Sequence, residues 1–237
     1  MAQAHDSDSL NLVPVLSRRT LLAGASASAL LALPGCATIG GFSLVDAVRR
    51  LLTLSTQNAF SRLTQNDGFW NSAVARIGLP TLFGKRGGII EGILASAGFR
   101  DQLQKRLNNI AEVGARAAAP MVADAVRTVG IDNAVAIIKG DPTAATSFLR
   151  AGMGAGLINT MIPALGVGMR VANDPIIGQA LSALTGVNIG DAAHALALEA
   201  DNAIWYEIGA SEADIRANPE KTNDALLIAA LKGAKAF

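Results

Sequence analysis

The sequence has one cysteine and few charged or aromatic residues, and each shortage excludes a class of protein. A single cysteine, Cys36, excludes an internal disulfide framework and a cysteine-rich metal site. Charged residues make up only 16% of the 237 residues and the formal net charge is +1, so the chain lacks the strong positive field that holds nucleic acid. Because 51% of the residues are hydrophobic, the composition also excludes intrinsic disorder. With seven Phe, two Trp and one Tyr, the core must be built mainly from aliphatic side chains.

The N-terminal part of the sequence has the pattern of an export signal. Arg18 and Arg19 precede an uncharged stretch that is rich in Ala, Gly, Ser and Leu. Adjacent arginines before a short apolar segment are typical of twin-arginine signals. The alternative is a membrane-spanning helix, but only the 14 residues 20–33 separate the arginines from Pro34, whereas a span needs about 20. We therefore predict that residues 1–35 are a cleaved twin-arginine-type signal peptide.

Cys36 lies where a lipoprotein signal ends. The sequence Leu33-Pro34-Gly35-Cys36 resembles a lipobox, in which small residues precede a cysteine that is lipidated and becomes the mature N-terminus. Two or three acyl chains anchor a protein stably where one does not. Ala37 follows instead of Asp, which by the usual bacterial sorting rule favours the outer membrane. We predict an outer-membrane lipoprotein at the periplasmic face of a bacterial envelope; the alternative is cleavage by ordinary signal peptidase near Ala37.

The remaining chain suits one helical domain. Residues 36–237 number 202, a length typical of a single domain. We expect residues 36–42 to be the lipid anchor with a short tether, and residues 43–237 to form the domain. Strand-like alternation is nearly absent and helical spacing dominates. The predicted fold class is all-α, a single compact domain of about eight or nine helices.

Two segments have long helical patterns. The first helix is predicted to start after Ser43, a suitable N-cap, because apolar residues fall on one face between positions 44 and 63. The second is predicted to run from Phe99 to about Ala118. Pro120 then predicts a kink or break, with a continuation over residues 121–129 that stops at a glycine.

Capping residues predict where the later helices start. Asp141-Pro142 and Asp174-Pro175 each place an N-cap before a proline at the first helical position. Ser211 to Asp214 resembles a capping box with Asp in place of Glu. Residues 134–138 are the one stretch with a strand as the alternative. The later helices are predicted over residues 132–139, 141–150, 174–184, 191–208, 211–217 and from Thr222 onward.

Residues 151–169 form the longest uncharged stretch after the signal segment. Its 19 residues approach the length of a membrane span. Five glycines, Asn159 and Pro163 argue against a stable helix exposed to lipid. We predict a buried helical hairpin, and the alternative is an element that dips into a membrane or holds an apolar ligand.

Charge is distributed unevenly along the mature chain. Residues 37–170 carry 14 basic and 8 acidic side chains, whereas residues 171–237 carry 4 basic and 9 acidic ones. The opposite balances, +6 and −5, predict that the two parts attract and pack against one another. The alternative is that the basic part faces anionic lipid.

Several phrases of the mature chain resemble a known family. They are Asn66-Asp67-Gly68-Phe69-Trp70-Asn71 with Ile77-Gly78-Leu79-Pro80, then 140–148, and finally Trp205-Tyr206-Glu207-Ile208 with 215–219. In this order and spacing, over about Leu44 to Phe237, the chain resembles a bacterial envelope family catalogued as domain of unknown function 4197. The resemblance implies an export signal and a helical domain, and it supplies no activity and no catalytic residue. The chain departs from the family pattern at residues 151–169, where relatives tend to be charged.

Few side chains are candidates for chemistry. His194, the one histidine after the signal segment, shares a predicted helix face with Asp191 and Asp201, a pattern that can ligate metal. A solvated helix histidine is the plainer interpretation. Paired carboxylates such as Glu207 and Glu212 lie near predicted helix ends, where capping explains them. No cofactor is predicted.

Four further side chains are candidates for a recognition surface. Trp70, Trp205, Tyr206 and Arg216 stand out in a chain with so few aromatic residues. The alternative is that the aromatic side chains fill an aliphatic core and that Arg216 interacts with a helix C-terminus.

These observations lead to a prediction of function class. We expect a non-enzymatic binding or scaffold module, held at the membrane through Cys36, whose partner is another envelope protein or a lipid-like amphiphile. The alternative is an envelope enzyme that uses carboxylates and His194, with or without a metal. The sequence indicates no nucleic-acid partner and does not indicate an oligomeric state.

Overall fold

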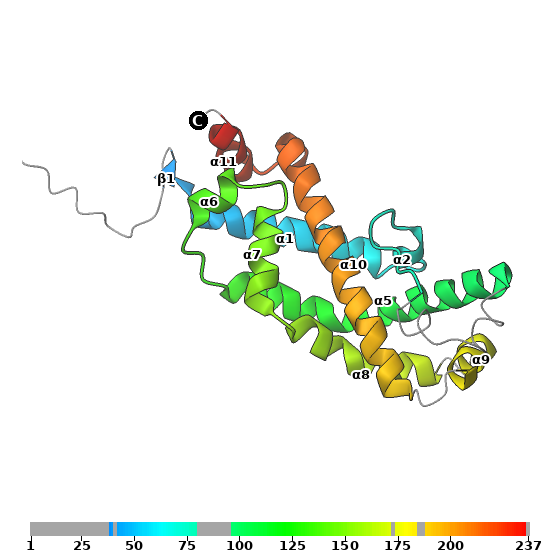
Figure 1. Ribbon diagram of the computed structural model, residues 1–237. Helices are drawn as coiled ribbons and strands as arrows, with labels where there is room; N and C mark the ends of the chain where they lie inside the picture. Colours follow the sequence, from blue (N-terminus) through cyan, green and yellow to red (C-terminus); the bar gives the residue numbers. More distant parts are fainter. Residues whose placement is uncertain (1–37, 40–41, 80–95, 172–173, 184–187, 236–237) are drawn as a thin grey trace, which may run out of the picture. The chain divides into compact units, whose positions relative to one another are not determined.

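A computed structural model describes residues 38–39, 42–79, 96–171, 174–183 and 188–235, which belong to one compact unit. These residues contain nine α-helices, one 3-10 helix and two short strands, so the predicted all-α class is confirmed (Figure 1). The elements are β1 (Thr38–Ile39), β2 (Phe42–Ser43), α1 (Leu44–Leu63), α2 (Gly68–Asn71), α5 (Ala97–Thr128), α6 (Ala134–Lys139), α7 (Ala144–Met153), α8 (Gly156–Val171), α9 (Pro175–Ala183), α10 (Ile189–Ala217), η1 (Pro219–Thr222) and α11 (Ala225–Lys235).

The strands β1 and β2 form an antiparallel hairpin where the sequence predicts a tether. Thr38 lies opposite Ser43, and Ile39 lies opposite Phe42. Strands of two residues are too short to produce an alternation signal in the sequence. The hairpin leads directly into α1, whose first turn is capped as predicted, because the backbone N–H of Asp46 donates to Ser43 Oγ at 3.3 Å.

Helices α1, α5, α8 and α10 form the centre of the domain. Helix α8 packs against α5 and α10, and α1 packs against α5 and α10. The core is aliphatic, as the shortage of aromatic residues predicts. Its largest fully buried side chains are Phe69, Leu51, Leu52, Leu63, Leu103, Leu107, Leu149, Leu157, Met161, Leu165, Leu196 and Ile204.

Residues 151–169 form a helix, a turn and a second helix. Helix α7 ends before Gly154, which has a φ of +52°, and α8 follows at an angle of 73°. The buried side chains of α8 recur at a spacing of four, Leu157, Met161, Leu165 and Met169. The segment is therefore buried along one face as predicted, although the 73° bend is smaller than that of an antiparallel hairpin.

Helix α8 can approach α5 closely because Gly114 faces it. A Cβ added at Gly114 would lie 2.8 Å from Leu165 Cδ2, which is shorter than any normal contact. Within the described residues no single helix is long and apolar enough to cross a membrane. The bent pair of residues 144–153 and 156–170 reaches that length and composition only when both helices are taken together.

Three predicted helix boundaries are wrong. Helix α7 begins at Ala144 with Thr143 at its N-cap position, and not after an N-cap at Asp141. Helix α5 continues through Pro120, because a proline removes only one backbone hydrogen bond and buried Ala118 and Val122 hold the helix on both sides of it. Helix α10 is continuous from Ile189 to Ala217, so the capping-box pattern at 211–214 lies inside a helix.

Ion pairs join the basic and acidic parts of the chain, in agreement with the prediction that the two parts pack together. Four pairs with nitrogen-to-oxygen distances between 2.6 and 2.9 Å connect residues before 171 to residues after it. They are Arg50–Asp224, Arg62–Glu207, Arg106–Asp174 and Arg150–Asp201.

Candidate functional site

The C-terminal half of α10, residues 201–217, carries a row of buried polar side chains. They are Asp201, Glu207, Ser211, Glu212 and Arg216, together with Trp205. Buried charges are tolerated when they are paired and hydrogen-bonded. Asp201, Glu207, Glu212 and Arg216 each have a partner on another element, and two further hydrogen bonds, Trp205–Asp201 and Arg216–Glu212, lie within α10.

Glu212 caps the N-terminus of α7. Its carboxylate is fully buried and accepts hydrogen bonds from the backbone N–H of Ala145 at 3.0 Å and of Thr146 at 2.7 Å. The hydroxyl of Thr146 donates to the same carboxylate at 2.6 Å. The first N–H groups of a helix have no partner within the helix, and a carboxylate there also interacts favourably with the helix dipole. Thr143, at the N-cap position of α7, makes no side-chain capping bond, so the cap comes from α10.

Arg216 binds the opposite kind of helix end. Its Nη1 donates to the carbonyl of Ile138 and its Nη2 to the carbonyl of Ile137, both at 2.8 Å, at the C-terminus of α6. Its Nε donates to Glu212 at 2.8 Å. Glu212 and Arg216 lie one turn apart on α10, so together they fix the end of α6, the start of α7 and the loop 140–143 between them.

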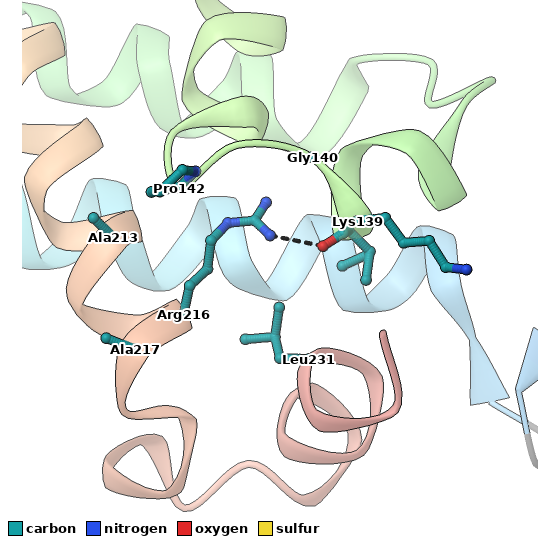
Figure 2. Close-up of a pocket in the computed structure, with 8 residues that line it drawn as sticks. Lys139, Gly140, Pro142, Ala213, Arg216, Ala217 and Leu231 are labelled. Carbon is teal, nitrogen blue, oxygen red and sulfur yellow. Dashed lines mark hydrogen bonds between the residues drawn. The ribbon is translucent and has the colours of Figure 1, made fainter. Parts of the chain in front are cut away.

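A cavity of about 300 Å³ lies beside this pair. Small-molecule sites have volumes of about 300–1,000 Å³, so the cavity is at the small end of that range. Figure 2 shows Arg216 reaching from α10 to the end of α6, with Leu231 of α11 opposite. The lining residues are Ile138, Lys139, Gly140, Pro142, Ala213, Arg216, Ala217 and Leu231. Most of them are apolar or small, and the two cationic residues contribute long aliphatic stems.

Asp201 joins α10 to α7 through a second buried arrangement. Trp205 Nε1 donates to Asp201 Oδ1 at 2.9 Å, and Arg150 Nη2 donates to Asp201 Oδ2 at 2.9 Å. Burial raises the pKa of the Asp201 carboxyl, while the hydrogen bonds from Trp205 and Arg150 act in the opposite direction. A cavity of about 180 Å³ borders this arrangement and is lined in part by Trp205 and Tyr206.

Glu207 joins α10 to the C-terminal end of α1. Its carboxylate accepts hydrogen bonds from Arg62 Nε at 2.6 Å and from the hydroxyl of Ser72 at 2.7 Å. Ser72 Oγ also accepts from the backbone N–H of Ala75 at 2.9 Å, so this hydroxyl anchors the turn after α2. A cavity of about 410 Å³ lies here, and most of its lining residues have polar side chains, among them Arg62, Ser72 and Glu207.

The four predicted recognition residues lie in different surroundings. Trp70 is half-buried and stacks with Arg76, whose guanidinium carbon lies 4.6 Å from the ring centroid. Tyr206 is 62% exposed, whereas Trp205 and Arg216 are only 3% and 9% exposed. An exposed surface containing Trp205 and Arg216 is therefore not found, because Trp205 donates to Asp201 and Arg216 donates to Glu212 and to the end of α6. Arg216 does meet a helix C-terminus, which is the alternative given above.

The structure does not bring together the three residues that were considered as metal ligands. His194 is exposed, Asp191 completes the capping box of α10 with Asn188, and Asp201 is bound to Trp205 and Arg150. Among the described residues, no three His, Cys, Asp or Glu side chains are grouped so that they could hold a metal ion.

The sequence predicts that Glu212 caps a helix end close to it, but the helix that Glu212 caps in the structure is α7. The visible signal is the spacing of Glu212 and Arg216 by four residues, which predicts a pair on one helix face. Nothing local identifies Ala145 and Thr146 as the partners, since they are 67 and 66 residues away. Three predicted residues, Arg18, Arg19 and Cys36, lie outside the described residues.

Comparison with known proteins identifies a family and nothing closer. The model of a family described as "Protein of unknown function (DUF4197)" matches residues 38–231. No curated protein and no solved structure matches the chain. The matched region starts at the first residue of β1 and ends at Leu231, which lines the cavity beside Arg216.

Proposed function

The chain belongs to the DUF4197 family of proteins of unknown function, and from this premise we propose that it is an exported envelope lipoprotein whose helical domain is a non-enzymatic binding module. The anchor is Cys36, at the periplasmic face of the outer membrane. The module receives an apolar group of an amphiphile or of another envelope protein.

The short spacing between Cys36 and the folded domain is the main observation that supports this proposal. Thr38, where both β1 and the family match begin, lies two residues after Cys36. Cleavage before Cys36 therefore removes the whole twin-arginine segment and leaves every residue of the matched region in place. A lipidation site at this position joins the anchor directly to the folded part.

The cavity beside Arg216 supports a binding role. Its walls come from α6, α10 and α11, and the hydrogen bonds of Glu212 and Arg216 hold two of those walls in place. A preformed cavity lined mainly by apolar groups is the usual form of a site for an apolar ligand.

Lipidation and sorting test the anchor. Cells grown with an alkyne fatty acid should label the wild-type protein but not Cys36→Ser. Replacement of both Arg18 and Arg19 by Lys should leave the precursor in the cytosol. Ala37→Asp should move the labelled protein to the inner membrane, whereas the control Ala37→Ser should stay in the outer membrane. A wild-type chain without label would contradict the anchor.

Native mass spectrometry of the mature lipoprotein tests the binding role. The expected result is a bound small molecule or a partner chain in addition to the mass of the lipidated protein. A single mass in every preparation, combined with no crosslinked partner in intact envelopes, would contradict a binding module.

A further inference from the structure

We infer that the cavity beside Arg216 holds an acyl chain of a phospholipid from the membrane in which the protein is anchored. The inference rests on the proposed lipid anchor at Cys36. It goes beyond the proposed function by naming the class of ligand, a phospholipid acyl chain, and its source, the membrane that holds the anchor.

The β1–β2 hairpin brings the anchor close to the start of α1. Thr38 pairs with Ser43, and paired residues on antiparallel strands have Cα atoms about 5 Å apart. Cys36 precedes Thr38 by two residues, which span about 7 Å at most. The chain between Cys36 and the hairpin is too short to reach further than about 12 Å from Ser43, so an anchor at Cys36 would hold this end of α1 close to the membrane surface.

The cavity lies at the same end of the domain. Arg50, in the second turn of α1, pairs with Asp224, just before α11, at 2.7 Å. Helix α6 packs against both α1 and α11. Figure 1 shows β1, α6 and α11 gathered at one end of α1. Since α6 and α11 line the cavity, it lies at the end of the domain that is nearest to the proposed anchor.

The polar cavity at Glu207 lies at the other end of α1. Arg62, one of its lining residues, is in the last turn of this 20-residue helix. A helix of that length extends about 30 Å. Two cavities are therefore near the anchored end, the one beside Arg216 and one of about 360 Å³ lined by Asp46, Arg49, Arg50, Thr53, Leu54 and Asp224. Four of the six residues that line the second cavity are charged, so the cavity beside Arg216 is the better match for a hydrocarbon chain.

The lining of the cavity favours a hydrocarbon chain. Ile138, Pro142, Ala213, Ala217 and Leu231 supply apolar walls. A sugar or peptide group would leave polar atoms without partners against such walls, which is unfavourable. A methylene group occupies about the volume of a water molecule, ~30 Å³, so a cavity of about 300 Å³ holds roughly ten methylenes. That is part of one acyl chain.

Photocrosslinking in vesicles tests the inference. The mature lipoprotein is reconstituted in phosphatidylethanolamine and phosphatidylglycerol with a phospholipid that carries a diazirine on its acyl chain. After irradiation, mass spectrometry should locate lipid adducts on the peptides that contain Ile138, Ala217 and Leu231.

A pair of matched variants makes the test specific. Ala217→Trp fills the cavity and should reduce these adducts by about tenfold. Ala117→Trp adds the same side chain at an exposed position of α5 and should leave them unchanged. Thermal unfolding monitored by circular dichroism checks that both variants are folded.

The possible failures are distinguishable. Adducts confined to residues 37–46 would overturn the inference and leave the anchor intact. Equal adducts in wild type and Ala217→Trp would also overturn it, and so would occupation of the cavity by the acyl chains of Cys36 itself. Absence of fatty-acid labelling on Cys36 would instead overturn the proposed function on which the inference rests.

Discussion

The two halves of α10, residues 189–200 and 201–217, hold their neighbours by different interactions. The N-terminal half buries only small or aliphatic side chains, Ala192, Ala193, Leu196, Ala197 and Ala200. It packs closely with α8, where Gly166 lies opposite Ala193. The C-terminal half also buries Ile204, Ile208 and Ile215, and it adds directional hydrogen bonds in which the carboxylates of Asp201, Glu207 and Glu212 accept and Arg216 donates.

The difference predicts how each half responds to substitution. Apolar burial is non-directional and roughly proportional to area, so a side chain of similar volume can replace the original one. A buried hydrogen-bonded charge cannot be removed in this way, because its partners are left buried without an acceptor or donor. The N-terminal half should therefore tolerate replacement of an apolar side chain by another of similar volume. The C-terminal half should lose stability when one member of a buried hydrogen-bonded pair is removed.

Glu212→Ala should have the largest effect. It leaves two backbone N–H groups of α7, the Thr146 hydroxyl and the Arg216 guanidinium without their acceptor. Removing one partner of a buried ion pair lowers the free energy of unfolding by about 3–5 kcal/mol. Urea denaturation followed by circular dichroism measures this loss. A loss as small as that of a surface substitution would show that the cap on α7 contributes little.

Leu196→Ala should have the next largest effect. Leu196 is fully buried in the apolar half of α10, and truncation of such a side chain lowers the free energy of unfolding by about 3 kcal/mol. The control Leu196→Met conserves volume and should lower it by less than about 1.5 kcal/mol. Similar losses for both variants would contradict the claim that this half is held by non-directional packing.

Glu112→Gln should give a smaller effect that depends on pH. Glu112 on α5 is buried, with the N–H of Gly68 at 3.1 Å and Arg116 at 3.9 Å. Burial raises the pKa of its carboxyl, although Arg116 and Gly68 oppose the rise. The folded protein therefore binds this proton more tightly than the unfolded chain, and the charged carboxylate destabilises the fold above its folded pKa.

The sign of the pH effect follows from that raised pKa. The Gln variant should be more stable than wild type at neutral pH, since it carries no buried charge at this position. The advantage should shrink as the pH falls through the raised pKa and should vanish below the pKa of the unfolded state. Urea titrations at several pH values measure the difference. A constant difference at all pH values would mean that the charge of Glu112 is not the cause.

His194→Ala should have the smallest effect. His194 is exposed on the apolar half of α10, and surface substitutions usually change stability by less than about 0.5 kcal/mol. The variant should also keep the wild-type distribution in the envelope and the wild-type mass in native spectra. A larger loss of stability, or a metal adduct that disappears in the variant, would show that His194 has a partner in the native protein.

Local signals predicted the parts of the fold that depend on neighbouring residues. The first helix starts after Ser43 as expected, and Asp174 accepts a hydrogen bond from the N–H of Ile176 at 2.8 Å at the start of α9. In both cases the cap and its partner are within three residues of one another. The predicted start of α7 at Asp141 is wrong, because the residue that caps this helix is Glu212, which is far away in the sequence.

The candidate site was predicted only in part for the same reason. Arg216 was identified as a residue of interest, but as an exposed one, since its spacing on a helix does not reveal what packs over it. The cavity beside it needs α6, α10 and α11, which lie far apart in the sequence. The continuity of α5 through Pro120 also cannot be predicted from neighbouring residues, because packing on both sides of the proline outweighs the loss of one backbone hydrogen bond.

The sequence by itself determined the all-α class, the aliphatic core, the family and the expectation of a lipid anchor, because composition, periodicity and short motifs are properties of neighbouring residues. Tertiary structure decided which helix ends Glu212 and Arg216 bind, which aromatic side chains are buried, and where the cavity forms. These depend on contacts between residues far apart in the sequence, such as the 79 positions between Ile137 and Arg216, and the geometry of such contacts exists only after α10 has packed against its neighbours.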